Sequence, residues 1–317
     1  MAAFLLADIG GTNARFGILE NGKLGCFAVM PVADFADPVA AIGAFLAREG
    51  KGRAPTKAIL AAAGPVLDGR IALTNAAWVV DGDAIGRSCG MTSVRLVNDF
   101  AALVLSLPAL TPGDLRAVGG GLPVAGAPCL VVGPGTGFGV GAAISGLRQE
   151  VDLASEGGHA TLAAENRRED AIIQSLRQRF DHVSIERVLS GAGLARLYQA
   201  VMAVDGIAAP DRDGPAIVAR ALAGDCAASV ATLELFCALL GSVAGDLALT
   251  FGARGGVYIG GGIVRRFADF LERSAFRRRF EAKGRMSPYL AAMPVHVILN
   301  RQPAFLGLAR LAQNDPA

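Results

Sequence analysis

Three observations predict that this chain folds as a two-lobed α/β protein. Its 317 residues are roughly twice the usual length of one domain, so two lobes are expected. Hydrophobic residues make up 52% and charged residues 18%, which allows a large core and excludes a disordered or fibrous chain. Apolar strands alternate with helical patterns, and the Gly/Pro-rich piece 111–128 breaks both periodicities. We therefore place the boundary between the lobes at the start of that piece.

The first lobe is predicted to begin with a strand over 3–9 and to continue through hairpins. Their turns read Asn21-Gly22 and Asp68-Gly69, dipeptides that favour tight hairpin turns. A helix follows that opens at Asp37 and Pro38 and closes at Gly50. A strand "KAILAAAG" and a strand-to-helix passage "SVRLVNDFAALVLSL" complete the lobe.

The second lobe is predicted to start as the first does, with an apolar strand "CLVV" that leads into "GPGTGFGVGAAI". Placing Gly11-Thr12 over Gly135-Thr136 aligns two strand, Gly-Thr turn, strand passages, which hints at two similar lobes. Helical patterns follow at 165–180, 193–204 and 227–251. Strands "GGVYI" and "VHVIL" precede a last helix near 305–312.

Charge and cysteine usage exclude several classes of function. The formal net charge is only +2 and the basic residues are scattered, so neither nucleic acid nor a membrane is an expected partner. The one basic run, 277–279, is interpreted as a solvated helix face. The N-terminus has no basic flank and meets Asp8 too soon for a signal peptide, which predicts a cytoplasmic protein. Five cysteines lie far apart among apolar neighbours, so each is expected to act as a small hydrophobe.

Three glycine clusters at strand ends are candidates for holding a phosphate. Residues without a Cβ let backbone N–H groups approach a phosphate and adopt left-handed dihedrals, as Gly10 and Gly11 could. Thr12 adds a hydroxyl donor, and Asp8 at the strand end could hold Mg²⁺, directly or through water. The other clusters are "GPGTGFG" and "IGGGI", the latter opening a helical pattern. Ordinary hairpin turns are the plain alternative for any one of them.

Five polar residues are candidates for recognising a polyol, because they offer many directed donors and acceptors. They are Asn98, Asp99, Glu156, His159 and Glu186. Asp99 ends a strand, where it could accept a proton from a hydroxyl that attacks phosphorus. Taken alone, a helix N-cap is the favoured role for this residue type at that place. An interior histidine and a first-turn helix carboxylate are the structural alternatives for His159 and Glu186.

Eight motifs, in order over nearly the whole chain, resemble the bacterial glucokinase family of the actin-like ATPase and hexokinase superfamily. They are "ADIGGTNARFGI", "AAAGPV", "LTNAAW", "VNDFAAL", "GTGFGVG", "SEGGHATLA", "ERVLSGAGL" and "GGVYIGGGIVRRF". The resemblance implies a two-lobed actin-like (ribonuclease H-like) fold with the active site in the interdomain cleft. It implies ATP-dependent phosphorylation of D-glucose at the 6-hydroxyl, the first step of glycolysis, by a cytoplasmic homodimer whose lobes close on the substrate. The expected domains are 1–110, with a C-terminal helix at about 300–317 packing back on it, and 111–299.

The resemblance also implies roles for individual residues. Asp99 would be the catalytic base, and glucose would be bound by Asn98, Asp99, Glu156, His159 and Glu186. ATP would be bound by Asp8, Ile9, Gly10, Gly11, Thr12, Asn13, Gly133, Gly135, Thr136, Gly137, Gly260, Gly261 and Gly262, with Mg²⁺ at Asp8. The chain departs from the family in "LTNAAW", where the small Ala76 follows Asn75. That departure puts the contact made by this loop in doubt.

Two other functions stay open at this point. A sugar-responsive binding protein could keep the fold and lack turnover, although binding alone would not require Asp99 beside a reacting hydroxyl. A nicotinamide oxidoreductase could use Gly137-x-Gly139-x-x-Ala142, which formally fits the GxGxxA fingerprint. However, "AISGLRQEVDL" follows it as strand and turn without opening the helix that this fingerprint requires.

Overall fold

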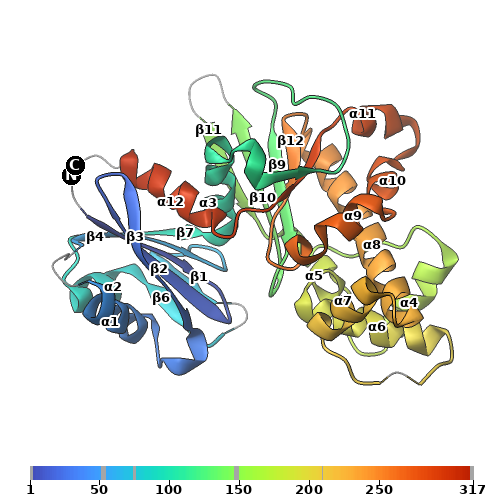
Figure 1. Cartoon of the computed structure of the whole chain (residues 1–317), viewed down its shortest axis with the longest axis horizontal. Coiled ribbons are helices and arrows are strands. Elements are labelled where there is room, and N and C mark those ends of the chain that lie inside the picture. Colours follow the sequence, from blue (N-terminus) through green and yellow to red (C-terminus); the bar gives the residue numbers. More distant parts are fainter. Residues whose placement is uncertain (1–2, 51–54, 74–75, 146–149, 209, 315–317) are drawn as a thin grey trace. The chain divides into compact units, whose positions relative to one another are not determined.

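The computed structural model describes residues 3–50, 55–73, 76–145, 150–208 and 210–314. The chain divides into two compact units, which are drawn in Figure 1. Unit 1 consists of Met1–Thr111, Asp152–Ala154 and Asn300–Ala317, and unit 2 consists of Pro112–Val151 and Ser155–Leu299.

Unit 1 is built on a five-stranded sheet in the order β3-β2-β1-β4-β7. β1, β4 and β7 run parallel to one another, whereas β2 and β3 are antiparallel to their neighbours. The strands are β1 (Phe4–Ile9), β2 (Asn13–Glu20), β3 (Lys23–Pro31), β4 (Lys57–Ala62) and β7 (Ser93–Asn98). A separate small hairpin pairs β5 (Arg70–Ala72) with β6 (Val79–Asp81), and a short 3-10 turn η1 (Val32–Asp34) follows β3.

Alternation along β1 divides the core of unit 1 between the two faces of its sheet. Leu5, Ala7 and Ile9 belong to one cluster, which receives the apolar sides of α1 (Pro38–Glu49) and α2 (Gly82–Cys89). Phe4 and Leu6 belong to the other, with residues of α3 (Asp99–Ser106) and α12 (Pro303–Gln313). The C-terminal helix α12 therefore packs on the sheet formed by the N-terminal residues (Figure 1).

The predicted local signals of unit 1 are confirmed. The Asp37 side chain accepts a hydrogen bond from the Ala40 N–H at 2.8 Å, so it caps α1 at its N-terminus. Asn21 and Gly22 have φ of 50° and 75°, as a two-residue hairpin between β2 and β3 requires. Asp68 and Gly69 adopt the same left-handed region, at 48° and 71°.

Unit 2 contains a six-stranded sheet in the order β11-β10-β9-β12-β13-β8. Its strands are β8 (Leu115–Ala117), β9 (Cys129–Pro134), β10 (Phe138–Ser145), β11 (Glu150–Ser155), β12 (Gly256–Ile259) and β13 (Val295–Ile298). Its α-helices are α4 (Arg167–Arg177), α5 (Ile185–Val188), α6 (Gly191–Val204), α7 (Gly214–Ala223), α8 (Ala227–Phe251), α9 (Ala268–Arg273), α10 (Phe276–Glu281) and α11 (Ser287–Ala291). Short 3-10 turns include η2 (Leu107–Ala109) at the end of unit 1, and η3 (Pro112–Asp114), η4 (Gly157–His159), η5 (Val264–Phe267) and η6 (Gly284–Met286) in unit 2.

Helix α8 is the central helix of the unit 2 core, and its bounds match the predicted 227–251 pattern. Among the described residues it is the one helix long and apolar enough to cross a membrane by length and composition. However, 67% of its most apolar window is buried inside the structure. This burial is typical of a core helix, and apolar residues of α7 and α10 pack against it.

The piece 111–128 contains an ordered strand and is not only a linker. β8 lies within it and pairs antiparallel with β13, where Val297 faces Arg116. It is an edge strand of three residues, which is too short for a period-2 pattern to stand out in the sequence.

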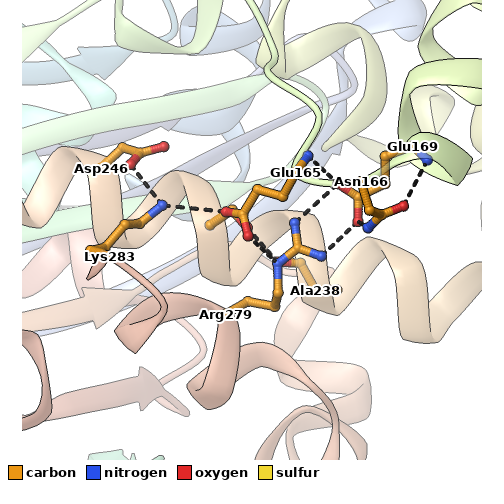
Figure 2. A network of polar contacts seen from close by, with 8 residues as sticks. Glu165, Asn166, Glu169, Ala238, Asp246, Arg279 and Lys283 are labelled. Atoms are coloured by element: carbon orange, nitrogen blue, oxygen red, sulfur yellow. Dashed lines mark hydrogen bonds and ion pairs between the residues drawn. The ribbon is translucent and has the colours of Figure 1, made fainter. Parts of the chain in front are cut away.

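The interpretation of 277–279 as a solvated helix face is wrong for two of its three arginines. Arg277 donates to the Met293 carbonyl at 3.0 Å, and Arg279 is buried against Glu169. Figure 2 shows the Arg279 guanidinium directed at Glu165 and Glu169. A charge count cannot reveal this, because the partner carboxylate lies about 110 residues away in sequence.

Candidate active site

In unit 1 the carboxyl ends of three parallel strands form one line at the edge of the sheet. Ile9 of β1 is in register with Ala62 of β4, and Ala62 is in register with Asn98 of β7. Adjacent strands lie about 4.8 Å apart, so the ends of β1 and β7 are separated by about 10 Å. Asp8 and the glycine turn therefore lie at the same edge as Asn98 and Asp99.

The first glycine turn joins β1 to β2 as a short hairpin. The Gly10 N–H donates to the Asn13 carbonyl at 3.0 Å, and the Thr12 carbonyl accepts from the Val32 N–H at 3.0 Å. These bonds fix the backbone of the turn, while the side chain of Thr12 is exposed. A ligand can therefore reach the Thr12 hydroxyl.

Arg15 lies directly across the hairpin from Asp8, a contact that the sequence motifs did not predict. Arg15 Nη1 donates to Asp8 Oδ2 at 3.2 Å, and the two residues are in register on β1 and β2. Burial raises the pKa of Asp8, and the charge and hydrogen bond of Arg15 offset this only in part. The Asp8 side chain keeps 23% of its surface exposed, so a ligand can still reach it.

Asn98 and Asp99 have different structural positions. Asn98 is the N-cap of α3: its Oδ1 accepts from the N–H groups of Phe100 and Ala101 at 2.9 and 3.1 Å. Its Nδ2 donates to the Gly64 carbonyl at 3.0 Å, which ties β7 to the loop after β4. Asp99 is the first residue of the helix, so the capping role that the sequence favoured for it belongs to Asn98.

In unit 2 three backbone turns converge at the ends of β9 and β12. A Cβ on Gly133 would overlap the Gly260 carbonyl, and one on Gly261 would overlap the Pro134 carbonyl. The Gly191 N–H donates to the Gly135 carbonyl at 3.0 Å, so the first turn of α6 lies against the second glycine turn. The motifs did not predict that α6 belongs to this site, although the Ser190 N-cap before Gly191 is a signal in the sequence that could have indicated it.

The glycines of these turns serve different purposes, and only some of them have left-handed backbone. Gly261 has a φ of 93°, whereas Gly10 and Gly135 do not adopt positive φ. Gly135 has open space where a Cβ would stand. Gly133 is needed for close backbone packing, and the absence of a side chain at Gly135 leaves room for a ligand.

The third turn is followed only by the short η5 and the six-residue α9. The helix expected to begin at "IGGGI" is therefore short. The helix whose N-terminus meets a glycine turn is instead the 14-residue α6. Gly260 is buried, while Gly261 and Gly262 are exposed. The exposed Thr136 lies within the second turn, where the Gly135 N–H donates to the Gly137 carbonyl at 2.8 Å.

Glu156, His159 and Glu186 are brought together around Phe138, the residue that directly follows the second glycine turn. Glu186 Oε2 accepts from the Phe138 N–H at 2.8 Å. On the other side, Gly158 packs so closely on the Phe138 carbonyl that a Cβ would overlap it. Gly158 lies between Glu156 and His159 in η4, and these two side chains are about half exposed, with 3.7 Å between His159 Nε2 and Glu156 Oε2.

Antiparallel hydrogen bonds hold the chain after η4 against the start of α5. The Ile185 N–H donates to the Ala160 carbonyl at 2.9 Å, and the Leu162 N–H donates to the Val183 carbonyl at 3.0 Å. Glu186 is therefore fixed beside Glu156 and His159 by backbone geometry. Of the other candidate residues, Asn75 lies outside the described residues.

Each of the two α/β units has a glycine-turn hairpin beside acidic side chains at strand ends. This arrangement defines the class of actin-like sugar kinases. The family model described as Glucokinase matches residues 5–315. The chain is 47% identical to the glucokinase of Paramagnetospirillum magneticum over 98% of both chains. It is 45% identical to that of Aromatoleum aromaticum, over 98% of this chain and 94% of the relative. The chain therefore belongs to the Glucokinase family.

Solved structures agree with this assignment. A glucokinase from an Antarctic psychrotroph superimposes with a TM-score of 0.86 at 36% identity, covering 99% of this chain and 100% of that chain. A glucokinase from Balamuthia mandrillaris in complex with glucose superimposes at 0.82 with 17% identity, covering 98% and 94% of the two chains. A ROK family glucokinase from Streptomyces griseus in complex with glucose and AMPPNP gives 0.69 at 22%, covering 99% and 100%. The last two show the fold alone.

Proposed function

We propose that this protein transfers the γ-phosphoryl group of ATP to the 6-hydroxyl of D-glucose. The observation that carries the proposal is the position of Phe138, because one residue joins the second glycine turn to the cluster of Glu156, His159 and Glu186. Phe138 directly follows the turn proposed to hold phosphate and contacts the cluster proposed to bind a polyol. This arrangement suits a kinase, which must bring the phosphorus of ATP and a hydroxyl of the sugar together. The family assignment supports the same activity.

We assign nucleotide binding to the glycine turns of both units. In unit 2, the N-terminus of α6 beside Gly135 offers the positive end of a helix dipole to a phosphate. Gly260, Gly261 and Gly262 would lie by the adenosine, as the family resemblance implies. In unit 1, the turn from Gly10 to Asn13 would contact the terminal phosphates.

Mg²⁺ fits Asp8 as a single-carboxylate site. The described residues contain no group of three or more His, Cys, Asp or Glu that could hold a metal ion by themselves. Mg²⁺ is commonly bound by one or two carboxylates together with substrate phosphates and water, so one carboxylate at the phosphate turn is sufficient. When bound, the ion would neutralise charge on the phosphates, and Asp8 would hold it while Arg15 keeps the carboxylate oriented.

We assign glucose binding to Asn98, Asp99, Glu156, His159 and Glu186. Asn98 uses its side chain to cap α3 and to bond Gly64, so its part is to fix the position of Asp99. Asp99 would orient the 6-hydroxyl and accept its proton late in the transfer. A carboxylate with an ordinary pKa of about 3.9 is a weak base for an alcohol, so positioning and charge neutralisation supply most of the rate.

The proposal includes a working form in which glucose is held by residues of both units and the units close on it.

We also propose a cytoplasmic homodimer, which size-exclusion chromatography with light scattering would test. We propose that the domains are 1–110, with the C-terminal helix at about 300–317, and 111–299, which is close to the division into units 1 and 2.

The decisive experiment is a coupled assay of the purified protein with ATP, Mg²⁺ and a panel of hexoses. We expect glucose 6-phosphate to form at the turnover typical of enzymes, on the order of 1–10³ per second. Binding of glucose without turnover would support the alternative of a sugar-responsive binding protein. Activity on another hexose with no activity on glucose would show that the polyol cluster has been assigned the wrong substrate.

A further inference from the structure

Three arginines of unit 2 surround one aromatic ring. The guanidinium carbons of Arg187, Arg196 and Arg179 lie 4.6, 5.6 and 5.8 Å from the centroid of the Phe180 ring. They come from three places in the chain: the segment after α4, the short helix α5 and the helix α6. We refer to Arg179, Arg187 and Arg196 as the arginine cluster.

The arginine cluster lacks the acidic partners that other arginines of unit 2 have. Arg168 pairs with Asp205 at 2.7 Å, and Arg279 pairs with Glu169 at 2.6 Å. Among the described residues, no carboxylate lies within ion-pair distance of the cluster's three guanidinium groups. The Phe180 ring face attracts these cations, but it does not neutralise their mutual repulsion.

The repulsion acts on Arg196, which is partly buried. Burial lowers the pKa of Arg196, the charges of Arg187 and Arg179 lower it further, and Glu186 acts in the opposite direction. Arg196 is also held in place, because its Nη1 donates to the Arg187 carbonyl at 3.3 Å. The cluster is therefore a concentration of positive charge on an otherwise nearly neutral protein, with Arg196 held in place and Arg179 and Arg187 exposed to solvent.

We propose that the arginine cluster binds a phosphate group, supplied by inorganic phosphate or by a small phosphate monoester. Three positive charges exceed what one carboxylate neutralises, whereas phosphate carries close to two negative charges at neutral pH. The planar guanidinium fork matches phosphate oxygens, and Arg196 and Arg187 lie close together because Arg196 Nη1 donates to the Arg187 carbonyl. None of its three arginines is among the residues assigned to the nucleotide.

The cluster is connected to the proposed glucose site through α5. Arg187 follows Glu186 directly, and Glu186 bonds the Phe138 N–H. A bound phosphate would place negative charge near the Glu186 carboxylate and repel it from its present position, so we expect it to raise the KM for glucose. This consequence rests on the proposed function, whereas phosphate binding itself does not.

Isothermal titration with inorganic phosphate and with glycerol 3-phosphate tests the proposal. Chloride is used to hold the ionic strength constant, and saturating AMPPNP is present to occupy the nucleotide site. The test variant is Arg179→Gln with Arg187→Gln. The matched control is Arg177→Gln with Arg220→Gln, which removes the same net charge from residues outside the cluster.

We expect the Kd for the anion to rise at least about tenfold in the test variant and to stay within about twofold in the control. Tighter binding of one of the two anions identifies the source of the phosphate group. Any of three results would overturn the proposal. Anion binding could weaken equally in both variants, it could be unchanged in both, or the parent protein could fail to bind the anion at millimolar concentration. An inactive protein that still binds phosphate in this pattern would contradict the proposed function and leave the anion site standing.

Discussion

At the residue scale, the division of roles between Asn98 and Asp99 explains why the two adjacent polar residues are both needed. The Asn98 side chain is committed to three hydrogen bonds that fix the start of α3 and the loop at Gly64. Asp99 therefore does not have to supply the cap. A rigid cap beside a carboxylate is a suitable support for a general base, because orientation is a large part of its effect.

Replacing Asp99 by Asn tests that assignment. We expect kcat to fall by at least about 10²-fold while the Kd for glucose changes by less than about tenfold, since the amide keeps the shape and loses the basic oxygen. Steady-state kinetics and glucose titration provide the two numbers. Near-normal kcat would mean that Asp99 is only a structural residue of the first helical turn.

Cys226 corrects the view that every cysteine acts as a small hydrophobe. Hydrogen bonds from Ser229, then from Arg212 at 3.0 Å, lower the pKa of the Cys226 thiol to about 7. By contrast, burial raises the pKa of the Cys237 thiol far above its usual range. We expect iodoacetamide at pH 7.5 to label Cys226 well before Cys237, as peptide mass spectrometry would measure, because the thiolate is the nucleophile. Labelling of Cys237 first would contradict this.

At the element scale, the glycine turns of unit 2 combine backbone packing with ligand access. Gly133 packs on Gly260, whereas Gly135 faces open space. The two positions therefore separate structural from functional effects within a single turn.

We expect Gly133→Ala to lower the free energy of unfolding by about 1–3 kcal/mol, because its Cβ overlaps the Gly260 backbone. Gly135→Val should keep the stability of the parent within about 1 kcal/mol, raise the KM for ATP and lower kcat. Urea unfolding and steady-state kinetics distinguish the two variants. Unchanged ATP kinetics in a folded Gly135→Val protein would show that this turn is merely structural.

A buried ion pair joins α4 to α10 and α8. Glu169 accepts from Arg279 Nη1 and Nη2 at 2.6 and 3.0 Å and from the Glu165 N–H at 2.8 Å, and Arg279 Nε donates to Ser242 (Figure 2 shows the network). Burial acts to raise the pKa of Glu169, but the hydrogen bonds and charge of Arg279 outweigh it, so the pKa is lowered. The pair is complete enough to offset the cost of burying both charges.

Glu169→Gln should lower the free energy of unfolding by up to about 3 kcal/mol at pH 7, since Arg279 loses the more buried of its two carboxylate partners and keeps only Glu165. The lowered pKa means that the contribution is complete above the unfolded pKa of about 4.3 and disappears as pH falls through the folded pKa. Urea unfolding of parent and variant from pH 7 to pH 3 should therefore converge. Glu272→Gln, in an exposed pair with Arg116, is the control and should cost less than about 1 kcal/mol. Parallel curves at all pH values would refute the linkage.

At the scale of the whole molecule, the proposed glucose ligands come from both units, with Asn98 and Asp99 in unit 1 and Glu156, His159 and Glu186 in unit 2. A sugar that binds both sets favours a closed form by its differential affinity for the two states. Closure would exclude water from the γ-phosphate and so limit futile ATP hydrolysis.

We expect glucose without nucleotide to reduce the radius of gyration in small-angle scattering. Glu156→Ala should weaken glucose binding by about 1–3 kcal/mol and shift this response to higher glucose concentration. Trp78 is a poor reporter of closure, since it is only 5% exposed and its indole N–H donates to the Phe35 carbonyl within unit 1. An unchanged scattering profile at saturating glucose would count against closure.

The sequence by itself determined the features that depend on local patterns. Capping residues, hairpin dipeptides and hydrophobic periodicity predicted α1, α8 and the turns at Asn21-Gly22 and Asp68-Gly69, because these signals act over a few residues. Eight ordered motifs also determined the family. Only the tertiary structure decided which distant residues meet: Arg15 with Asp8, α6 with Gly135, and Glu169 with Arg279. Such contacts depend on strand register and helix packing, which place side chains far apart in sequence against one another and decide whether a charge is solvated or buried.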